Sequence, residues 1–267
     1  MSDKVKVAFF DFACCEGCQL TVLGAGEPLL ALLEHMQIVE WREAASEKSD
    51  EYDIAIVEGS IIRDSDVPRL LQIRERAETL IALGTCATQG GPHVSANNFD
   101  REELLRIIFG DKAEHFEAGE VRPLEAFVKV DIPIYGCPIN ADEFIKIMTH
   151  VLMHRPYYTP ALAVCYECKM NQYECVYDRG EICLGPVTQC GCNAICTSKG
   201  HRCFGCRGLM EAENVNAAKE IIEEHGYTLE QIMGMFNIYW QRQEDVRKLP
   251  ELPGKKGREP WRFKSTT

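Results

Sequence analysis

The stretch VKVAFFDFACCEGCQL (residues 5–20) joins a short apolar run to three cysteines, Cys14, Cys15 and Cys18. Residues 5–10 have the length and the β-branched and aromatic content of a buried strand. Three further runs of this kind follow in the first half of the chain, at residues 54–57, 80–83 and 130–135. The sequence therefore predicts short buried strands, the first of which leads directly into the cysteines.

Helical patterns separate these predicted strands. Apolar residues recur at helical spacing in four segments, residues 28–35, 67–77, 101–108 and 141–151. Alternation of strands and helices is typical of a mostly parallel sheet with helices on both faces. We therefore expect a flavodoxin-like, doubly wound α/β domain over residues 1–155.

The sequence changes character after this domain. Residues 156–210 contain nine cysteines and no apolar period long enough for a conventional core, so they are predicted to form a small cysteine-rich module. Residues 211–267 combine helical patterns at 214–225 and 229–248 with a basic tail. The tail is expected either to be solvated or to dock on a partner subunit through Trp261 and Phe263.

Composition argues against several classes of function. The 267 residues carry 29 Lys and Arg against 41 Asp and Glu, a net charge of −12, whereas nucleic-acid binders present an excess of positive charge. No apolar run approaches the roughly 20 residues that span a bilayer. The first residues also lack the order of a secretory signal. We therefore expect a cytoplasmic chain without a transmembrane segment and without a nucleic-acid partner.

The cysteine content is high, with 14 in the chain. Disulfides are rare in a reducing compartment, so metal or redox chemistry is the leading explanation for the set. Buried structural thiols would account for only a few of them.

The cysteines of the first half all follow predicted strands. Cys14, Cys15 and Cys18 follow the first strand, Cys86 in LGTCATQGG follows the third, and Cys137 in YGCP follows the fourth. The carboxyl ends of parallel strands meet at one edge of an open sheet, which is where ligands bind in this architecture. Four thiolates converging there suit a 4Fe-4S cluster or a tetrahedral structural zinc.

Spacing favours particular ligands within the first group. Cys15 and Cys18 form a C-x2-C pair, and Gly17 eases the bend between them, so both thiols would reach one cofactor from one turn. We expect Cys14 to point elsewhere, because neighbouring side chains at a strand end face opposite sides.

Two carboxylates are predicted at the same edge, Glu16 between the cysteines and Glu58 at the end of the second strand. A buried carboxylate there would relay protons that leave a partner's active site. For Glu58, the competing interpretation is that it caps a helix or accepts backbone N–H bonds.

The cysteines of the module divide into two groups of four when Cys190 is left aside. The groups are Cys165, Cys168, Cys175 and Cys183, followed by Cys192, Cys196, Cys203 and Cys206. A segment with little apolar core and eight well-spaced thiols is expected to fold around cofactors, because ligand binding supplies folding free energy. On spacing alone, two zinc sites and two 4Fe-4S clusters fit equally.

Six motifs resemble those of the small, electron-transferring subunit of nickel-iron hydrogenases. In order along nearly the whole chain they are CEGCQL, VEGS, GTCATQGG, IYGCP, CLGPVT and CFGCRG. The succession of GTCATQGG and GCP is highly specific. The all-cysteine module and the missing export signal look most like the cytoplasmic branch of this family, which includes the sulfhydrogenase delta subunits. The resemblance favours iron-sulfur clusters over zinc.

The resemblance implies three 4Fe-4S clusters. The implied ligands are Cys15, Cys18, Cys86 and Cys137 for a proximal cluster in residues 1–155, Cys192, Cys196, Cys203 and Cys206 for a medial cluster, and Cys165, Cys168, Cys175 and Cys183 for a distal cluster. Cys165 stands where exported members carry a histidine ligand, and Cys196 adds a fourth medial thiolate where they have three. Both departures favour low-potential 4Fe-4S clusters, because thiolate donates more charge than imidazole.

Cys14 and Cys190 have no ligand role in this assignment. A related subunit of respiratory complex I uses tandem cysteines as ligands, so a pairing of Cys14 with Cys15 is the alternative for the proximal site, although it leaves Cys18 unexplained.

The implied function is electron transfer. Electrons from H2 oxidation at a nickel-iron centre in a partner large subunit would pass to a flavin-bearing, NAD(P)-linked diaphorase subunit, or run in reverse to evolve H2. No GxGxxG motif is present, so this chain is not expected to bind the nicotinamide itself. The alternatives are the small subunit of a methyl-viologen-type hydrogenase that feeds a disulfide reductase, a complex I-like subunit, and a zinc-stabilised interaction protein.

Overall fold

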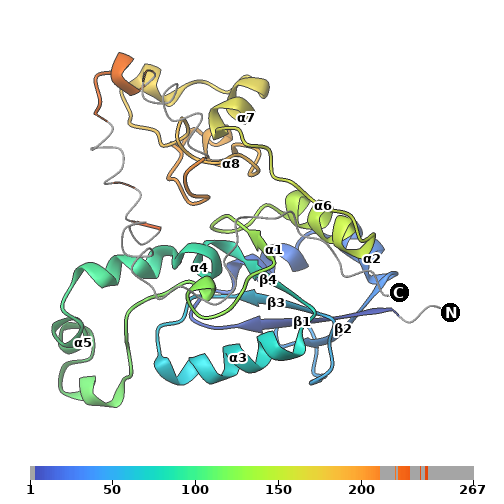
Figure 1. Ribbon diagram of the computed structural model, residues 1–267. Helices are drawn as coiled ribbons and strands as arrows, with labels where there is room; N and C mark the ends of the chain where they lie inside the picture. Colours follow the sequence, from blue (N-terminus) through green and yellow to red (C-terminus); the bar gives the residue numbers. More distant parts are fainter. Residues whose placement is uncertain (1–3, 211–219, 221, 229–234, 236–237, 240–267) are drawn as a thin grey trace.

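A five-stranded parallel sheet forms the centre of the larger domain (Figure 1). The computed structural model describes residues 4–210, 220, 222–228, 235 and 238–239. The strands are β1 Val5–Asp11, β2 Met36–Trp41, β3 Ile54–Glu58, β4 Thr79–Leu83 and β5 Ile132–Ile134, in the order β2-β1-β3-β4-β5. This order is that of the flavodoxin-like doubly wound fold. The predicted α/β class is therefore confirmed.

The sequence analysis missed β2 and made β5 too long. β2 pairs with β1 at the edge of the sheet, where Val5 lies opposite Met36. Its polar residues Gln37 and Glu40 interrupt the apolar run, as an edge strand allows, and so hid it. Trp41 nevertheless stacks on Phe9 with 3.9 Å between the ring centroids.

Helices cover both faces of the sheet. They are α1 Gly17–Leu23, α2 Glu27–Leu33, α3 Val67–Arg76, α4 Gly84–Gln89, α5 Arg101–Phe109 and α6 Ala141–Leu152, and the module adds α7 Val164–Met170 and α8 Ile195–Ser198. Short 3₁₀ helices lie at Asp64–Asp66, Gly91–Asn98, Gly110–His115, Leu124–Ala126 and Val176–Arg179. The four predicted helices correspond to α2, α3, α5 and α6. The helices α1 and α4, seven and six residues long, were not predicted; both begin within a few residues of a strand and carry a cysteine motif rather than a run of apolar residues.

Alternate strand residues feed two separate cores. One core packs β1, β3 and β4 side chains such as Phe9 and Ile56 against α1, α2 and α6. The other packs the opposite side chains, such as Val57 and Leu80, against α3 and α4. Both faces of the sheet are thus buried, as expected for a parallel sheet with helices on each side.

The cysteine-rich module lies above the sheet in the view of Figure 1. It has a small buried cluster of its own, which the sequence analysis did not anticipate. Val176, Leu184 and Val187 pack there with the cysteines Cys168 and Cys183. The module therefore has a core, but cysteines form part of it.

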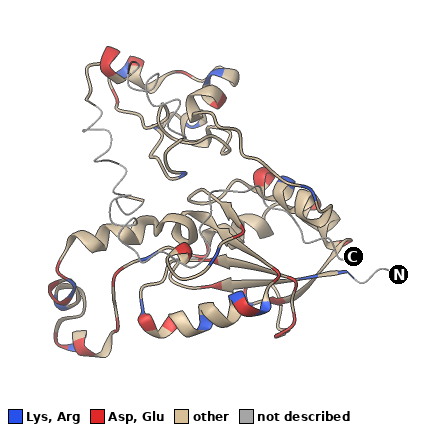
Figure 2. Cartoon of the chain, viewed as in Figure 1, with Lys and Arg blue, Asp and Glu red and all other residues tan. Residues whose placement is uncertain are grey.

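Figure 2 shows acidic and basic residues along α3, on the side of the sheet away from the module. No helix in the described part of the chain is long and apolar enough to cross a membrane. Most of the helices predicted at residues 214–225 and 229–248, and the tail with Trp261 and Phe263, lie outside the described residues.

Candidate metal centres

The first-half cysteines meet where strands end. Cys15 and Cys18 lie at the start of α1, Cys86 lies in α4 and Cys137 follows β5. Burial and a charge on Cys137 together raise the pKa of the Cys86 thiol to about 12. Burial and a charge on Cys15 raise the pKa of Cys137, and burial and a charge on Cys86 raise that of Cys18. Each of the four predicted proximal residues therefore interacts electrostatically with at least one other of the set.

Two glycines leave room for these sulfurs. Gly84 has a φ of +81°, and a Cβ there would collide with the Sγ of Cys18. A Cβ on Gly91, with a φ of +66°, would lie 2.5 Å from the Sγ of Cys86. The GTCATQGG motif therefore provides the thiol of Cys86, and its glycines leave space beside the thiols of Cys18 and Cys86.

Cys14 also lies close to this group. Burial raises the pKa of its thiol to about 12, with a further contribution from the charge of Glu58. Charges on Cys14 and Cys15 both raise the pKa of Cys86. Of these two, the charge on Cys15 also raises the pKa of Cys137. The assignment of Cys15 stays a prediction, with Cys14 as its alternative.

Glu58 is buried, with 1% of its surface exposed, and it orders the start of α1. Its Oε1 accepts a hydrogen bond from the backbone N–H of Cys18 at 3.2 Å, and its Oε2 accepts one from Gln19 at 3.0 Å. Burial raises the pKa of the Glu58 carboxyl. Glu16 instead pairs with the exposed Arg42. The backbone-accepting role of Glu58 is therefore observed, whereas a proton relay at either residue stays a prediction.

The first cysteine group of the module also gathers in space. Burial, together with charges on Cys183, Cys168 and Cys175, raises the pKa of the Cys165 thiol to about 12. A Cβ on Gly185 would lie 3.3 Å from the Sγ of Cys165. These are the four residues of the predicted distal set.

The second group of the module lies between the other two. Burial raises the pKa of the Cys206 thiol to about 12, and charges on Cys192, Cys137 and Cys196 contribute in the same direction. The pKa of Cys203 is raised by burial and by charges on Cys183 and Cys206.

Hydrogen bonds join the three groups. The Oγ1 of Thr85, next to Cys86, donates to the backbone oxygen of Cys206 at 2.6 Å, and the backbone N–H of Cys203 donates to the Sγ of Cys183 at 3.2 Å. Cys86 belongs to the first-half group and Cys183 to the Cys165 group, so the Cys206 group stands between them. The result is a row of three thiol groups.

The donor set of each group fits an iron-sulfur cluster. Every predicted ligand is a cysteine, the usual ligand of 4Fe-4S clusters. Buried thiols with raised pKa values favour the protonated form, and the positive charge of bound iron would stabilise the thiolates. In the part of the chain that the structure describes, no three His, Cys, Asp or Glu side chains are placed to hold a single metal ion.

Cys190 is buried and has its own partner. Its Sγ donates to the backbone oxygen of Pro160 at 3.4 Å, and its backbone oxygen accepts from the Nε of Arg207 at 2.9 Å. These contacts are consistent with a structural thiol, in agreement with leaving Cys190 outside the ligand sets.

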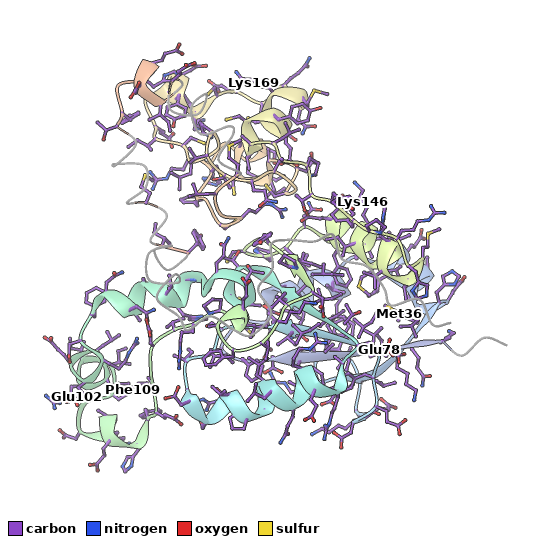
Figure 3. All side chains as sticks on the ribbon, viewed as in Figure 1. Met36, Glu78, Glu102, Phe109, Lys146 and Lys169 are labelled. Carbon is purple, nitrogen blue, oxygen red and sulfur yellow. The ribbon has the colours of Figure 1, made fainter. Side chains whose placement is uncertain are left out.

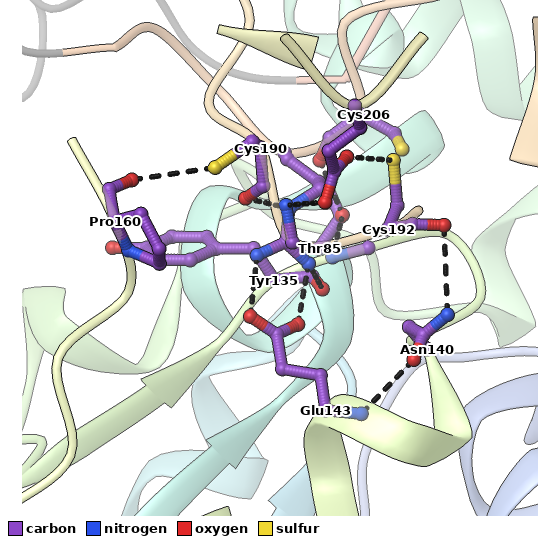
Figure 4. A network of polar contacts seen from close by, with 12 residues as sticks. Thr85, Tyr135, Asn140, Glu143, Pro160, Cys190, Cys192 and Cys206 are labelled. Atoms are coloured by element: carbon purple, nitrogen blue, oxygen red, sulfur yellow. Dashed lines mark hydrogen bonds and ion pairs between the residues drawn. The ribbon is translucent and has the colours of Figure 1, made fainter. Parts of the chain in front are cut away.

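The sequence analysis missed a buried ion pair beside the Cys206 group. The guanidinium of Arg207 makes two hydrogen bonds to the carboxylate of Glu143 in α6, at 2.6 and 2.7 Å. Figure 4 shows Glu143 in a polar network with Tyr135, Cys190 and Cys192. One feature of the sequence could have indicated that Glu143 is buried: it lies one helical turn before the apolar residue Ile147, on the same face of the helix.

A flavodoxin-like domain with thiols at its strand ends, extended by a cysteine-rich module, is the class of protein that the fold and the site define. Residues 15–151 match the family of the NADH ubiquinone oxidoreductase 20 Kd subunit. The sulfhydrogenase 2 subunit delta of Pyrococcus furiosus is 38% identical over 222 residues, which cover 82% of this chain and 93% of that protein.

Two further relatives agree. A subunit of the F420-non-reducing hydrogenase vhu of Methanocaldococcus jannaschii is 31% identical, over 78% of this chain and 83% of the relative. A chain in the crystal structure of an NAD+-reducing [NiFe]-hydrogenase in the H2-reduced state is 27% identical with a TM-score of 0.54, over 59% of this chain and 96% of that chain. This chain belongs to the 20 Kd subunit family, and within it to the small subunits of hydrogenases, oxidoreductases that act on hydrogen as complexes. The resemblance seen in the sequence is confirmed.

Proposed function

We propose that this chain carries electrons between a nickel-iron large subunit and a flavin-bearing, NAD(P)-linked subunit through three 4Fe-4S clusters. The direction would be outward when H2 is oxidised and inward when H2 is evolved. Bound iron-sulfur clusters would accept and donate the electrons one at a time, a role that the polypeptide itself does not supply. We place this function in the cytoplasm.

The ligand assignment follows the three thiol groups. Residues 1–155 would hold the proximal cluster, residues 156–210 would hold the medial and distal clusters, and residues 211–267 would add helices and the basic tail. The proximal ligands would be Cys15, Cys18, Cys86 and Cys137, the medial ligands Cys192, Cys196, Cys203 and Cys206, and the distal ligands Cys165, Cys168, Cys175 and Cys183. The observation that supports this proposal best is the row of three groups, joined by the hydrogen bonds from Thr85 to Cys206 and from Cys203 to Cys183.

The proposal requires a large subunit that holds the nickel-iron centre, because all twelve assigned cysteines serve iron-sulfur clusters. The exposed apolar surface of α5 is compatible with work in a complex. None of the residues of α5 is buried, and Ile107 and Ile108 are 73% and 60% exposed. Figure 3 shows Phe109 at the end of this helix, far from the sheet. An apolar patch of this kind is typical of an interaction surface.

A second candidate differs in the electron acceptor. The match to the F420-non-reducing hydrogenase relative covers more of this chain than the match to the NAD+-reducing structure does, 78% against 59%. This difference favours a small subunit of a methyl-viologen-type hydrogenase that feeds a disulfide reductase. The subunits that copurify with this chain decide between the two acceptors.

The test is anaerobic purification of the complex, followed by metal and sulfide analysis. We expect about twelve irons per copy of this chain beyond those of the other subunits, as three four-iron clusters require. Two or three zincs without sulfide would overturn the cluster proposal. A flavin-bearing copurifying subunit would support the NAD(P)-linked assignment, and a disulfide reductase would support the second candidate.

A further inference from the structure

Among the described residues, Arg207 is the largest side chain that is almost completely buried. It is 1% exposed, and its carboxylate partner Glu143 is 5% exposed. Burying a charged pair costs desolvation free energy, which replacement by apolar residues of similar size would often avoid. The pair therefore calls for a reason other than stability.

The hydrogen bonds of Arg207 supply such a reason. Besides binding Glu143, its Nη1 donates to the backbone oxygen of Tyr135 at 2.7 Å, and its Nε donates to that of Cys190 at 2.9 Å. Tyr135 stands two residues before Cys137, Cys190 stands two residues before Cys192, and Arg207 itself directly follows Cys206. One guanidinium thus joins the backbone of three segments that carry proposed ligands.

These segments belong to two different sites. Cys137 is a proposed proximal ligand on the α/β domain, whereas Cys192 and Cys206 are proposed medial ligands on the module. Figure 4 shows Tyr135, Cys190, Cys192 and Cys206 in one polar network, with the carboxylate of Glu143 at its edge. The pair therefore lies where the spacing between the two sites is set.

Glu143 holds the guanidinium from the side of the larger domain. Its helix α6 is capped at the N-terminus by Asn140, whose Oδ1 accepts a hydrogen bond from the backbone N–H of Glu143 at 2.9 Å. The Nδ2 of Asn140 also approaches the backbone oxygen of Cys192, at 3.5 Å. The start of α6 is thus a fixed support that contacts the medial loop directly and through Arg207.

We propose that Arg207, held by Glu143, is a positioning residue that fixes the separation between the proximal and medial clusters. The inference rests on the proposed function, because it concerns two of its clusters. The role is geometric, since only a planar guanidinium has donors arranged to reach Glu143, Tyr135 and Cys190 at once. A lysine at this position keeps the charge and loses the shared contacts.

The test compares Arg207→Lys and Arg207→Gln with wild type in the anaerobically purified complex. The readout is the splitting of the electron paramagnetic resonance signal after full reduction, when neighbouring clusters are both paramagnetic. This magnetic interaction falls steeply with distance between the clusters. We expect both variants to keep their iron and to lose part or all of the splitting between proximal and medial clusters.

The control is Arg179→Gln, which removes another arginine of the module. Arg179 donates to the backbone oxygen of Gly200 at 2.7 Å, a contact between two residues of the module, so its loss is expected to leave the splitting between proximal and medial clusters unchanged. An unchanged splitting in both Arg207 variants would overturn the proposal. So would loss of the medial and distal iron with the proximal signal intact, because Arg207 would then hold the fold of the module. A wild-type complex without clusters would overturn the proposed function first, and this inference with it.

Discussion

The α/β domain and the cysteine-rich module hold their cysteines in different ways. In the α/β domain, two large apolar cores made of residues such as Ile56 and Leu80 fix the strands, and among the described residues Cys18 is the one cysteine in either core. In the module, the buried cluster itself includes Cys168, Cys183 and Cys203. The apolar cores of the α/β domain support its cysteine site without depending on it. The cysteines of the module, in contrast, are part of the buried cluster that holds the module together.

The difference has an energetic basis. Full burial of an aliphatic or aromatic side chain contributes about 1.5–3 kcal/mol, and the sheet buries many such residues on both faces. The module has few of them, and its helices α7 and α8 are only seven and four residues long. Isolated helices of that length are marginal in water. Bound clusters would therefore have to supply much of the folding free energy of the module.

Removal of iron is the strongest way to test this comparison. We expect chelation of oxidised protein to unfold the module while the sheet stays folded. Amide hydrogen exchange, measured region by region, checks the prediction: protection in residues 164–206 should fall to nearly nothing, while β1, β3 and β4 should keep theirs. Equal loss of protection in the two regions would show that they depend on iron alike and would remove the distinction.

Loss of a single ligand is the next largest change, and it separates Cys15 from Cys14. The Cys15→Ser variant is expected to lose the proximal signal in electron paramagnetic resonance, while the module keeps its own signals because it folds around other thiols. The matched variant Cys14→Ser is expected to keep all three. The opposite pattern would assign Cys14 as the ligand and reinstate the tandem arrangement.

The same logic applies to the neighbouring cysteines of the module. The Cys192→Ser variant should lose the medial signal. Cys190→Ala should keep it, because the hydrogen bond that the structure shows for the Cys190 thiol goes to the backbone oxygen of Pro160. Iron content per chain measures both variants. A loss of medial iron in Cys190→Ala would show that this thiol does more than fill space.

A smaller effect is expected from glycines beside the sulfurs. At Gly84 an added methyl group would collide with the Sγ of Cys18, and the φ of +81° adds strain of about 1–3 kcal/mol for any other residue. Gly84→Ala should therefore displace a proximal ligand and lower proximal occupancy. At Gly185 the φ is ordinary and the new methyl group would lie 3.3 Å from the Sγ of Cys165. Gly185→Ala is thus the milder counterpart, and similar iron loss in both would contradict this account.

The sequence predicted the α/β domain better than the module. Apolar runs such as residues 80–83 identify buried strands directly, and a parallel sheet brings strand ends together, so the meeting of Cys86 with Cys137 followed from topology. The helix α1 could not be predicted in this way, because it starts at Gly17 immediately after a strand and is stabilised by Glu58, a residue about 40 positions away. Long-range polar contacts of this kind leave no periodic pattern in a sequence.

The module shows more clearly what could not be predicted from the sequence. Its cysteine spacing predicted two groups of four, an assignment that stays a prediction, but spacing carries no information on what joins the groups. Arg207 and Glu143 are 64 positions apart, and each alone looks like an ordinary charged residue. Their pairing depends on how the module lies against α6, which only the folded chain shows.

The smallest effect in this series is expected at Glu167, which connects the distal and medial groups inside the module. It lies in α7 between Cys165 and Cys168, and its carboxylate accepts backbone hydrogen bonds from Gly191 at 2.8 Å and Ala194 at 3.2 Å, on either side of Cys192. Burial and the charge of Glu167 together raise the pKa of the Cys192 thiol to about 11.

Glu167→Gln keeps the side-chain shape but leaves one acceptor in place of two, so we expect a loss of about 1–3 kcal/mol in the stability of the module. The removed charge should also shift the medial reduction potential upward, because a negative charge nearby disfavours the added electron. Potentiometric titration of the complex measures the shift, and the control Glu181→Gln removes a half-exposed carboxylate paired with Arg179 instead. If both variants shift the medial potential equally, the effect belongs to the net charge of the module, and Glu167 does not connect the two groups.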